Sequence, residues 1–352
     1  MAPNDEKPLR ITLEDLAGVP EASGSNPIRP AQTGVPKAYG SIASDPSAPE
    51  PVAEKSSVFL QGWFYLGLAG LLGALAAWAI CEPAFVDGSR AGERWGNTWI
   101  IPGLITLMCV GFGVSESLVE RSVKKALLRG ALAIPLGIVL GFVFDFVANI
   151  IYSIGIQVSL NMGVQSNRNP ALWIARGIAW AVFGAAGGAI YGIVGRSLKK
   201  AQYGILGGML GAAVGGMIFD PIALAAGGAG LSRAIGFALV GAATGAAMGL
   251  VESMLKDRWL YVTAGPLAGK QFILYKNKTT IGAEQTADIY LFKDPNILPH
   301  HAAVEIQGSR VQVRALGAAF VGGGPVHIRV LQDGDLLQIG RYAFRYREKR
   351  RE

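Results

Sequence analysis

Few residues in this chain of 352 have types and spacing that could carry out chemistry. Two adjacent imidazoles, His300 and His301, stand in the stretch NILPHHAAVE, where a turn is expected to lead into a strand. No cluster with zinc-ligand spacing accompanies them, and no nucleophile–base pair or nucleotide-binding fingerprint is visible in the sequence. We therefore expect a protein without enzymatic activity, cofactor or metal ion.

A second group of candidate residues consists of acids and arginines at the ends of long apolar segments. Each acid ends one segment, and an arginine opens the next on the same side. An unpaired charge at the centre of a membrane helix costs about 2.5–3.5 kcal/mol, so a partner is expected. We predict one ion pair in each helical hairpin: Glu82 with Arg94, Asp145 with Arg176, and Asp220 with Arg233. The alternative is a path for ions or protons through the acids of the second and third pairs.

The composition divides the chain into three parts. Hydrophobic residues make up 51% of the chain and charged residues only 16%, which is unusual for a soluble protein. Residues 1–56 are rich in Pro, Ala and Ser, whereas 57–256 are almost continuously apolar and 257–352 return to an ordinary composition. We predict a disordered cytoplasmic tail, a membrane domain and a small folded domain.

The apolar part contains enough hydrophobic sequence for six membrane-spanning helices. Each crossing of a hydrocarbon core of about 30 Å needs roughly 20 residues. We place the spans near 59–81, 97–118, 129–153, 171–195, 203–220 and 231–252.

Basic residues predict the orientation of these spans. They cluster after the second, fourth and sixth spans, at 121–129, 196–200 and 256–258. By the positive-inside rule both termini lie in the cytoplasm. We attribute the net charge of +7 to topology and contact with membrane lipid, and we expect no nucleic acid partner.

The membrane part also repeats itself at an offset of 75 positions. The stretch VERSVKKALLRGALAIPLGIVLGFVFD (119–145) resembles VGRSLKKAQYGILGGMLGAAVGGMIFD (194–220). Together with the first hairpin, this predicts three hairpins of one orientation, related by a pseudo-threefold axis along the membrane normal.

Three strings of glycines spaced by four place a smooth stripe on one face of each of three helices. Such stripes allow backbones to approach closely, as in a glycine zipper. We expect tight packing within one helical bundle; homo-oligomerisation around a pore is the alternative. The strings are Gly184, Gly188 and Gly192; Gly207, Gly211 and Gly215; and Gly241, Gly245 and Gly249.

From Trp259 onward, short alternating runs such as WLYVTAG, KQFILY and RVQVRAL are separated by turns rich in Gly and Asp. This pattern predicts an all-β sandwich over 257–352. The stretches TTIGAEQTADIYL, HHA and LQDGDLLQIGRYAF stand in an order and spacing that resemble the forkhead-associated (FHA) domain. The resemblance implies a β-sandwich of a family that commonly binds phosphothreonine peptides.

The chain departs from that family where phosphate is read. By the resemblance, Ala283 replaces the recognition arginine and Leu298 replaces the phosphate-contacting serine, while Gly317 and Gly322 remain from a loop that holds asparagines in the family. Losing two or three charge-assisted hydrogen bonds, at about 1.5–3 kcal/mol each, weakens binding roughly a thousandfold or more. We expect His301 to be structural, His300 to be exposed, and phosphothreonine not to bind in the usual way.

Two functions follow. The first is an integral membrane adaptor or signalling scaffold in a bacterial inner membrane, whose FHA-like domain binds a protein without phosphothreonine. The second is a channel or transporter with the FHA-like domain as its regulatory or assembly module. The partner is expected to be a cytoplasmic protein or the chain's own tail, where PLRITLEDLAGVP could fold on binding.

Overall fold

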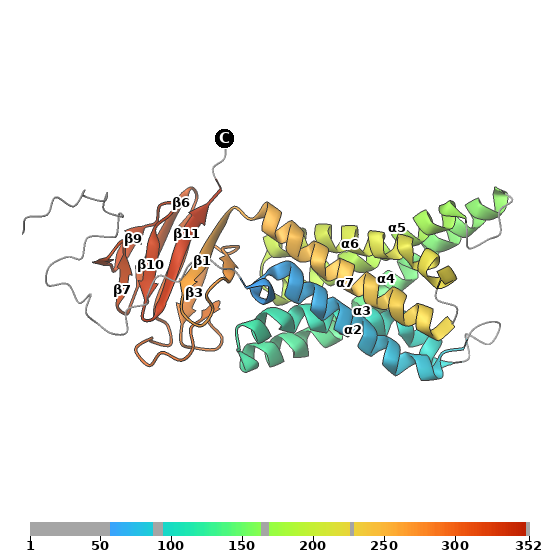
Figure 1. Ribbon diagram of the computed structural model, residues 1–352, viewed down its shortest axis with the longest axis horizontal. Helices are drawn as coiled ribbons and strands as arrows, with labels where there is room; N and C mark the ends of the chain where they lie inside the picture. The colour runs from blue at the N-terminus through green and yellow to red at the C-terminus, as the bar shows by residue number, and fades with distance from the viewer. Residues whose placement is uncertain (1–56, 87–93, 163–168, 226–228, 350–352) are drawn as a thin grey trace, which may run out of the picture. The chain divides into compact units, whose positions relative to one another are not determined.

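The structure, a computed structural model, describes residues 57–86, 94–162, 169–225 and 229–349 (Figure 1). The described residues of Ser44–Glu352 belong to one compact unit. Within those ranges six long helices precede eleven β-strands. The predicted tail, 1–56, lies outside the described residues.

The apolar part of the chain is helical over almost its whole described length. A short 3-10 turn, η2 (Val58–Leu60), leads into the first long helix, and a second, η3 (Glu82–Ala84), follows it. The long helices are α2 (Gly62–Cys81), α3 (Trp95–Val119), α4 (Val123–Asn161), α5 (Pro170–Val194), α6 (Leu198–Ala225) and α7 (Ala229–Leu255). In the described residues six helices have the length and hydropathy of membrane spans, which confirms the predicted number of apolar helices.

Helix α4 is longer than the sequence predicts, with 39 residues where a span of 129–153 was expected. The difference lies partly at its start, because an apolar window excludes the charged residues Lys124 and Lys125, which precede Arg129. These residues are nevertheless helical. The Lys124 backbone N–H donates to the Gln285 side-chain amide oxygen, and Lys125 Nζ donates to the Ala287 carbonyl oxygen. Arg129 donates to the Glu116 carboxylate.

The helices form a closed ring in chain order. Each helix packs on the next one, and α7 packs on α2 to complete the ring. Buried aromatic side chains such as Phe112, Trp180 and Phe237 fill the interior. On α4, by contrast, large apolar side chains including Leu127, Val139 and Phe146 are exposed.

The glycine strings contact neighbouring helices of the same chain. Gly184 and Gly188 of α5 face the backbone of α6 at Gly208 and Gly204. The string on α6 faces α7, and the string on α7 faces α2. A Cβ atom at these glycines would meet backbone atoms of the facing helix, so the absence of a side chain sets the distance between helices.

Replacing Gly188 by alanine is expected to lower stability by about 1–3 kcal/mol, because its Cβ would overlap the backbone at Gly204. The matched control is Gly103→Ala on α3, where the Cβ would lie 3.8 Å from Cys81 Sγ, an ordinary contact. Denaturant unfolding of the full chain in detergent measures both. Equal effects of the two substitutions would contradict this packing role.

Two turns separated by 75 positions have the same backbone structure. Arg121 and Arg196 both adopt positive φ, at 55° and 54°. In each turn the serine that follows the arginine donates its backbone N–H to the carbonyl oxygen five residues before that serine. Ser122 donates to Ser117 and Ser197 donates to Gly192, which is the hydrogen bond of a Schellman cap. The repeat of whole hairpins stays a prediction.

The C-terminal part is a sandwich of two sheets. One has the order β2–β1–β11–β10–β7–β8 and the other β4–β3–β5–β6–β9. The strands are β1 (Arg258–Ala264), β2 (Gln271–Ile273), β3 (Lys278–Gly282), β4 (Ile289–Tyr290), β5 (Ala302–Gln307), β6 (Arg310–Ala315), β7 (Ala319–Val321), β8 (Gly324–Pro325), β9 (Ile328–Val330), β10 (Leu336–Ile339) and β11 (Tyr342–Glu348).

Alternation along the strands builds the sandwich core. Leu260 and Val262 of β1 are buried, and so are Val311 and Val313 of β6. Residues two apart on a strand point to the same face, so these side chains fill the space between the sheets. The residues between them point outward. The candidate site lies in the loops that join the strands.

Candidate functional site

The predicted site residues lie in four loops of the sandwich: β3–β4, β4–β5, β6–β7 and β7–β8. Ala283 follows β3, and its N–H donates to the carbonyl oxygen of Leu298 at 2.9 Å. Gly282 allows this approach, because a Cβ there would overlap the Pro299 carbonyl. The Leu298 side chain is 46% exposed. The positions expected to read phosphate therefore present a methyl group and an exposed isobutyl group.

His301 holds these loops together. Its side chain is buried; Nδ1 accepts from the Leu298 N–H at 3.1 Å, and Nε2 lies 3.0 Å from the Ala318 carbonyl oxygen. This arrangement places the ring proton on Nε2. A Cβ on Gly317 would overlap the imidazole. Both nitrogens are used within the fold, so His301 is a structural residue of the loops.

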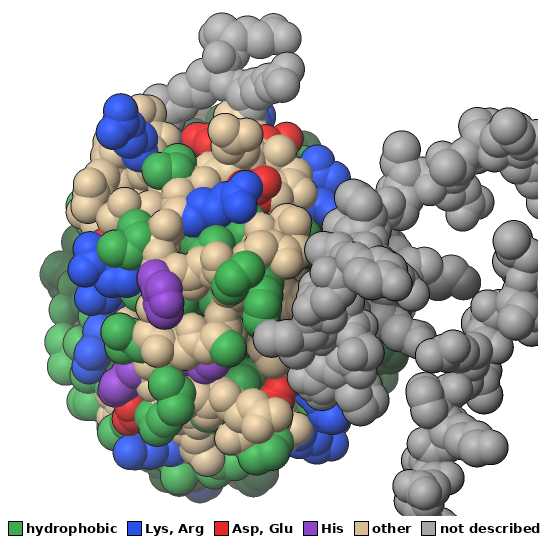
Figure 2. Space-filling view, turned by 90° about the vertical axis from the view of Figure 1, so that its left-hand side faces the viewer, with side chains coloured by type: hydrophobic (Ala, Val, Ile, Leu, Met, Phe, Trp, Pro, Cys, Tyr) green, Lys and Arg blue, Asp and Glu red, His purple; other side chains and the backbone are tan. Residues whose placement is uncertain are grey.

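His300 is exposed, and its Nε2 lies 3.1 Å from Glu284 Oε2. Figure 2 shows histidine side chains on one face of the sandwich, among hydrophobic and basic ones. Gly322 has a φ of 60° in a turn, with open space where a Cβ would stand. Leu316, next to Gly317, is 72% exposed. The loop face thus combines apolar side chains with one imidazole–carboxylate pair.

Hydrogen bonds connect the β4–β5 loop to β11 and to the turn before it. The Tyr342 hydroxyl donates to the Phe292 carbonyl oxygen at 2.7 Å, and burial raises the pKa of Tyr342 to about 12. The Asp294 carboxylate accepts from the backbone N–H groups of Asn296 and Arg341. These bonds hold the loop that presents Leu298.

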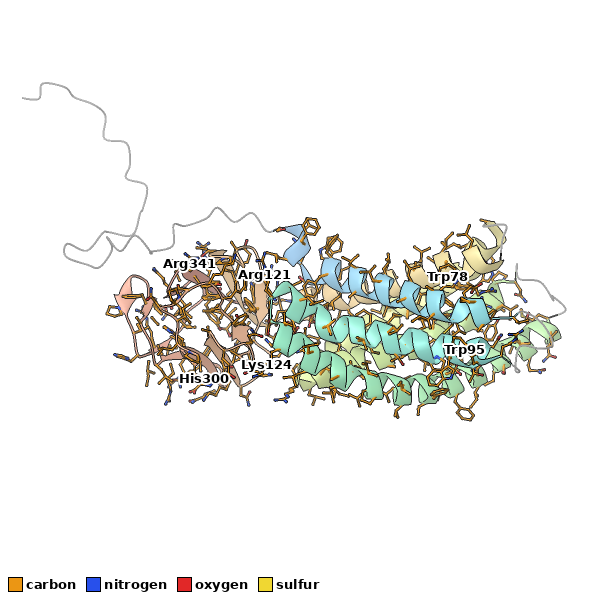
Figure 3. All side chains as sticks on the ribbon, turned by 90° about the horizontal axis from the view of Figure 1, so that it is seen from below. Trp78, Trp95, Arg121, Lys124, His300 and Arg341 are labelled. Carbon is orange, nitrogen blue, oxygen red and sulfur yellow. The ribbon has the colours of Figure 1, made fainter. Side chains whose placement is uncertain are left out.

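The β3–β4 loop also contacts the helices. The Ser122 hydroxyl donates to the Gln285 carbonyl oxygen at 2.8 Å, and the Lys124 backbone N–H donates to Gln285 Oε1 at 3.1 Å. Lys125 Nζ donates to the carbonyl oxygens of Ala287 and Asp288 at 2.9 and 3.0 Å. Arg121 and Lys124 lie beside the sandwich in Figure 3. Gln285, Ala287 and Asp288 of the β3–β4 loop are therefore hydrogen-bonded to the turn between α3 and α4 and to the start of α4.

A buried ion cluster accompanies that contact. Glu120, 1% exposed, accepts from Lys270 at 2.7 Å and from Lys125 at 2.9 Å. Lys270 precedes β2 and is also 1% exposed. No pattern in the sequence predicts this cluster. A lysine is almost never fully buried, and its spacing in GPLAGKQ carries no signal for a partner 150 positions away.

A second cluster lies at the same ends of the helices. Glu116 Oε2 accepts from Arg129 at 2.9 Å and from Lys200 at 2.7 Å. The Lys200 ammonium also lies 4.1 Å from the centre of the Tyr191 ring and 5.9 Å from that of Tyr275, a sandwich residue. The basic residues that served as topology signals thus make specific contacts.

The predicted ion pair between Glu82 and Arg94 is wrong. The Glu82 carboxylate binds Arg233 of α7, at 2.6 and 3.0 Å, and the Arg233 guanidinium also stacks on Phe85. The physical reason is the closure of the ring, which brings α7 against α2. The predicted pair of Asp220 with Arg233 stays a prediction, because the Asp220 side chain lies outside the described residues.

No ion pair joins Asp145 to Arg176 among the described side chains. Arg176 donates to the Tyr152 hydroxyl at 2.7 Å and lies over the rings of Tyr152 and Phe219. Asp145 is near Asn149, whose amide donates to the Asp145 carbonyl oxygen. The two rings belong to the neighbouring helices α4 and α6.

Asp288 gives the sandwich a dependence on pH. Burial would raise its pKa, but hydrogen bonds from Lys276 and Thr280 outweigh it and hold the pKa below the ordinary value. A depressed folded pKa adds stability above the unfolded pKa of about 3.9, and that stability is lost as the pH falls through the folded value. Asp288→Asn should therefore cost stability at neutral pH and little near pH ~2. Unfolding curves of both chains at the two pH values test this; a pH-independent difference would contradict it.

Comparison with known proteins agrees with this geometry. Residues 279–340 match the family model of the FHA domain. The C-terminal sandwich is an FHA domain.

The similarity to known proteins extends over only a small share of this chain. The glycogen accumulation regulator GarA of Mycolicibacterium smegmatis is 35% identical over 86 residues, 24% of this chain and 54% of that protein. The oxoglutarate dehydrogenase inhibitor of Corynebacterium efficiens is 36% identical over 86 residues, 24% of this chain and 60% of that protein. The chain thus spans just over half the length of these relatives. The solved FHA domain of CT664 from Chlamydia trachomatis aligns at 25% identity, over 27% of this chain and all of that one, with a TM-score of 0.25.

Proposed function

We propose that this protein is an integral membrane adaptor that presents a cytoplasmic FHA domain to a protein partner without requiring phosphothreonine. The observation that carries the proposal is the recognition face. Ala283 and Leu298 stand where charged and hydroxyl groups would hold a phosphate, and both nitrogens of His301 are used inside the fold. The exposed Leu298 and Leu316 favour an apolar contact instead.

Membrane insertion is part of the proposal. Exposed large apolar side chains recur along the helices, including Leu72 on α2, Phe146 on α4 and Val214 on α6. Contiguous apolar surface of this kind is unfavourable in water and favourable in lipid. The ends of α3 and α4 nearest the FHA domain carry Arg121, Lys124 and Lys125, which supports a cytoplasmic side for that domain. Trp78 and Trp95 lie toward the other ends of their helices in Figure 3, where an interfacial aromatic belt would stand.

A channel or transporter regulated by its FHA domain is the second candidate. What favours it is the direct bonding of the β3–β4 loop to the turn between α3 and α4, through Ser122, Lys125 and Gln285. A mere anchor needs no such contact. A ligand on the FHA loops would then be able to change the strain on α3 and α4, which a regulatory module requires.

Binding by the full chain in lipid nanodiscs separates these functions. A fluorescent pool of degenerate phosphothreonine peptides, its unphosphorylated twin and a peptide of residues 1–56 would each be titrated by polarisation. We expect no preference for the phosphorylated pool. A micromolar preference for it that is lost on substitution of His300 would overturn the proposal. Solute flux across liposomes holding the purified chain would favour the second candidate.

A further inference from the structure

A polar cavity of about 60 Å³ lies between the helix ends and the FHA domain. One water needs about 10–15 Å³ of such space, so the cavity has room for a larger polar group. Its lining comes from both parts of the unit. The helical part contributes Glu116, Arg129, Ser197 and Lys200, and the sandwich contributes Lys276 and Asp288.

The charged groups of this lining are unequal in number. Lys276 pairs with Asp288 at 2.6 Å, one cation to one carboxylate. Arg129 and Lys200, by contrast, share the single carboxylate of Glu116, at 2.9 and 2.7 Å. Three cations of the lining therefore face two of its carboxylates, and the Glu252 carboxylate beyond the lining also interacts with Lys200. Lys200 is 4% exposed, so its charge is in a region of low dielectric, where its attraction for an anion is strong.

The hydrogen-bonding groups match a phosphate. Arg129 offers the planar fork that binds phosphate oxygens in pairs, and lysine ammonium groups bind them as point charges. Ser197 lies just before α6, and its hydroxyl oxygen accepts a hydrogen bond from the backbone N–H of Lys200 at 3.2 Å. The amino end of this helix of 28 residues adds a partial positive charge on the same side.

We propose that the cavity binds a phosphate group, held by Arg129, Lys200 and Lys276. The group belongs to free inorganic phosphate or to an anionic lipid headgroup, because the cavity adjoins the helix ends expected at the cytoplasmic headgroup layer. Neither Ala283 nor Leu298 lines this site, although Asp288 of its lining belongs to the β3–β4 loop that holds Ala283. It connects the helices to the FHA domain, so its occupant strengthens their contact whatever the loops bind.

The test uses the full chain and three variants. Lys276→Gln and Arg129→Gln each remove a cavity cation. Lys278→Gln is the matched control, because Lys278 lies two residues away, is 63% exposed and pairs with Glu305 outside the cavity. Far-ultraviolet circular dichroism and melting in the absence of phosphate confirm that each variant is folded before binding is compared.

Two arms distinguish the sources of phosphate. In phosphatidylcholine nanodiscs, inorganic phosphate is titrated by calorimetry. In a second arm, native mass spectrometry counts phosphatidylglycerol retained after exchange from mixed micelles. We expect binding in one arm, weakened about tenfold by Lys276→Gln and by Arg129→Gln and unchanged by Lys278→Gln; tenfold corresponds to about 1.4 kcal/mol. Binding in neither arm, or equal loss in all three variants, would overturn the proposal.

Discussion

Replacing Glu120 by glutamine is expected to destabilise the folded chain by about 3–5 kcal/mol, because it removes a counterion from two buried ammonium groups. Lys270 and Lys125 both donate to this carboxylate, at 2.7 and 2.9 Å, and neither can reach water without breaking the contact between the helices and the FHA domain. Denaturant unfolding of the full chain in detergent, followed by tryptophan fluorescence, measures the loss.

Two further variants make this prediction specific. Glu284→Gln removes a carboxylate that pairs with the exposed His300, and is expected to cost less than about 1 kcal/mol. Adding Lys270→Met to Glu120→Gln should recover a large part of the loss, because the charge left unpaired is then absent. Lys125 keeps its bonds to the Ala287 and Asp288 carbonyls in that double variant. A loss below about 1 kcal/mol for Glu120→Gln would mean that water reaches the cluster.

The sequence predicts the elements of this protein better than their contacts. Apolar length is enough to find six helices, and alternation with turn residues is enough to find the sandwich. The start of α4 was missed because Lys124 and Lys125 are helical for a reason outside the helix, their bonds to the β3–β4 loop. A hydropathy pattern contains no information about such a partner.

The candidate site shows the same limit. The apolar positions Ala283 and Leu298 could be found because a family pattern fixes where a charged residue would stand. The pairing of Glu82 with Arg233 could not be found, because it depends on which helices close the ring, and hairpin order points to Arg94 instead. Lys270 is the extreme case, a charge buried against another part of the chain with no local sign of it.

Restoring the phosphate-reading groups is expected to create phosphothreonine binding, which the proposed function does not expect of the natural chain. The variant Ala283→Arg with Leu298→Ser supplies a guanidinium and a hydroxyl at the positions that the FHA resemblance assigns to phosphate contacts. Two charge-assisted hydrogen bonds at about 1.5–3 kcal/mol each correspond to roughly a hundredfold to ten-thousandfold gain in affinity. Polarisation with a phosphothreonine peptide pool and its unphosphorylated twin measures the gain in the full chain.

The loop geometry is the reason to expect that two substitutions are enough. The bond from the Ala283 N–H to the Leu298 carbonyl uses backbone atoms only, so both positions keep their spacing when the side chains change. His301 supports the loops from beneath through Leu298 and Ala318, and neither bond involves the altered side chains. The control is Ala283→Gln with Leu298→Ser, which adds a side chain of similar reach without charge and should gain little.

If the arginine variant also gains nothing while remaining folded, the bonds from Ser122 and Lys124 to Gln285 are the obstacle, since they hold the β3–β4 loop against the helices. Adding Gln285→Ala to the arginine variant should then release the side-chain bond to Lys124 and restore binding; failure of that variant too would show that this face has lost more than its phosphate contacts.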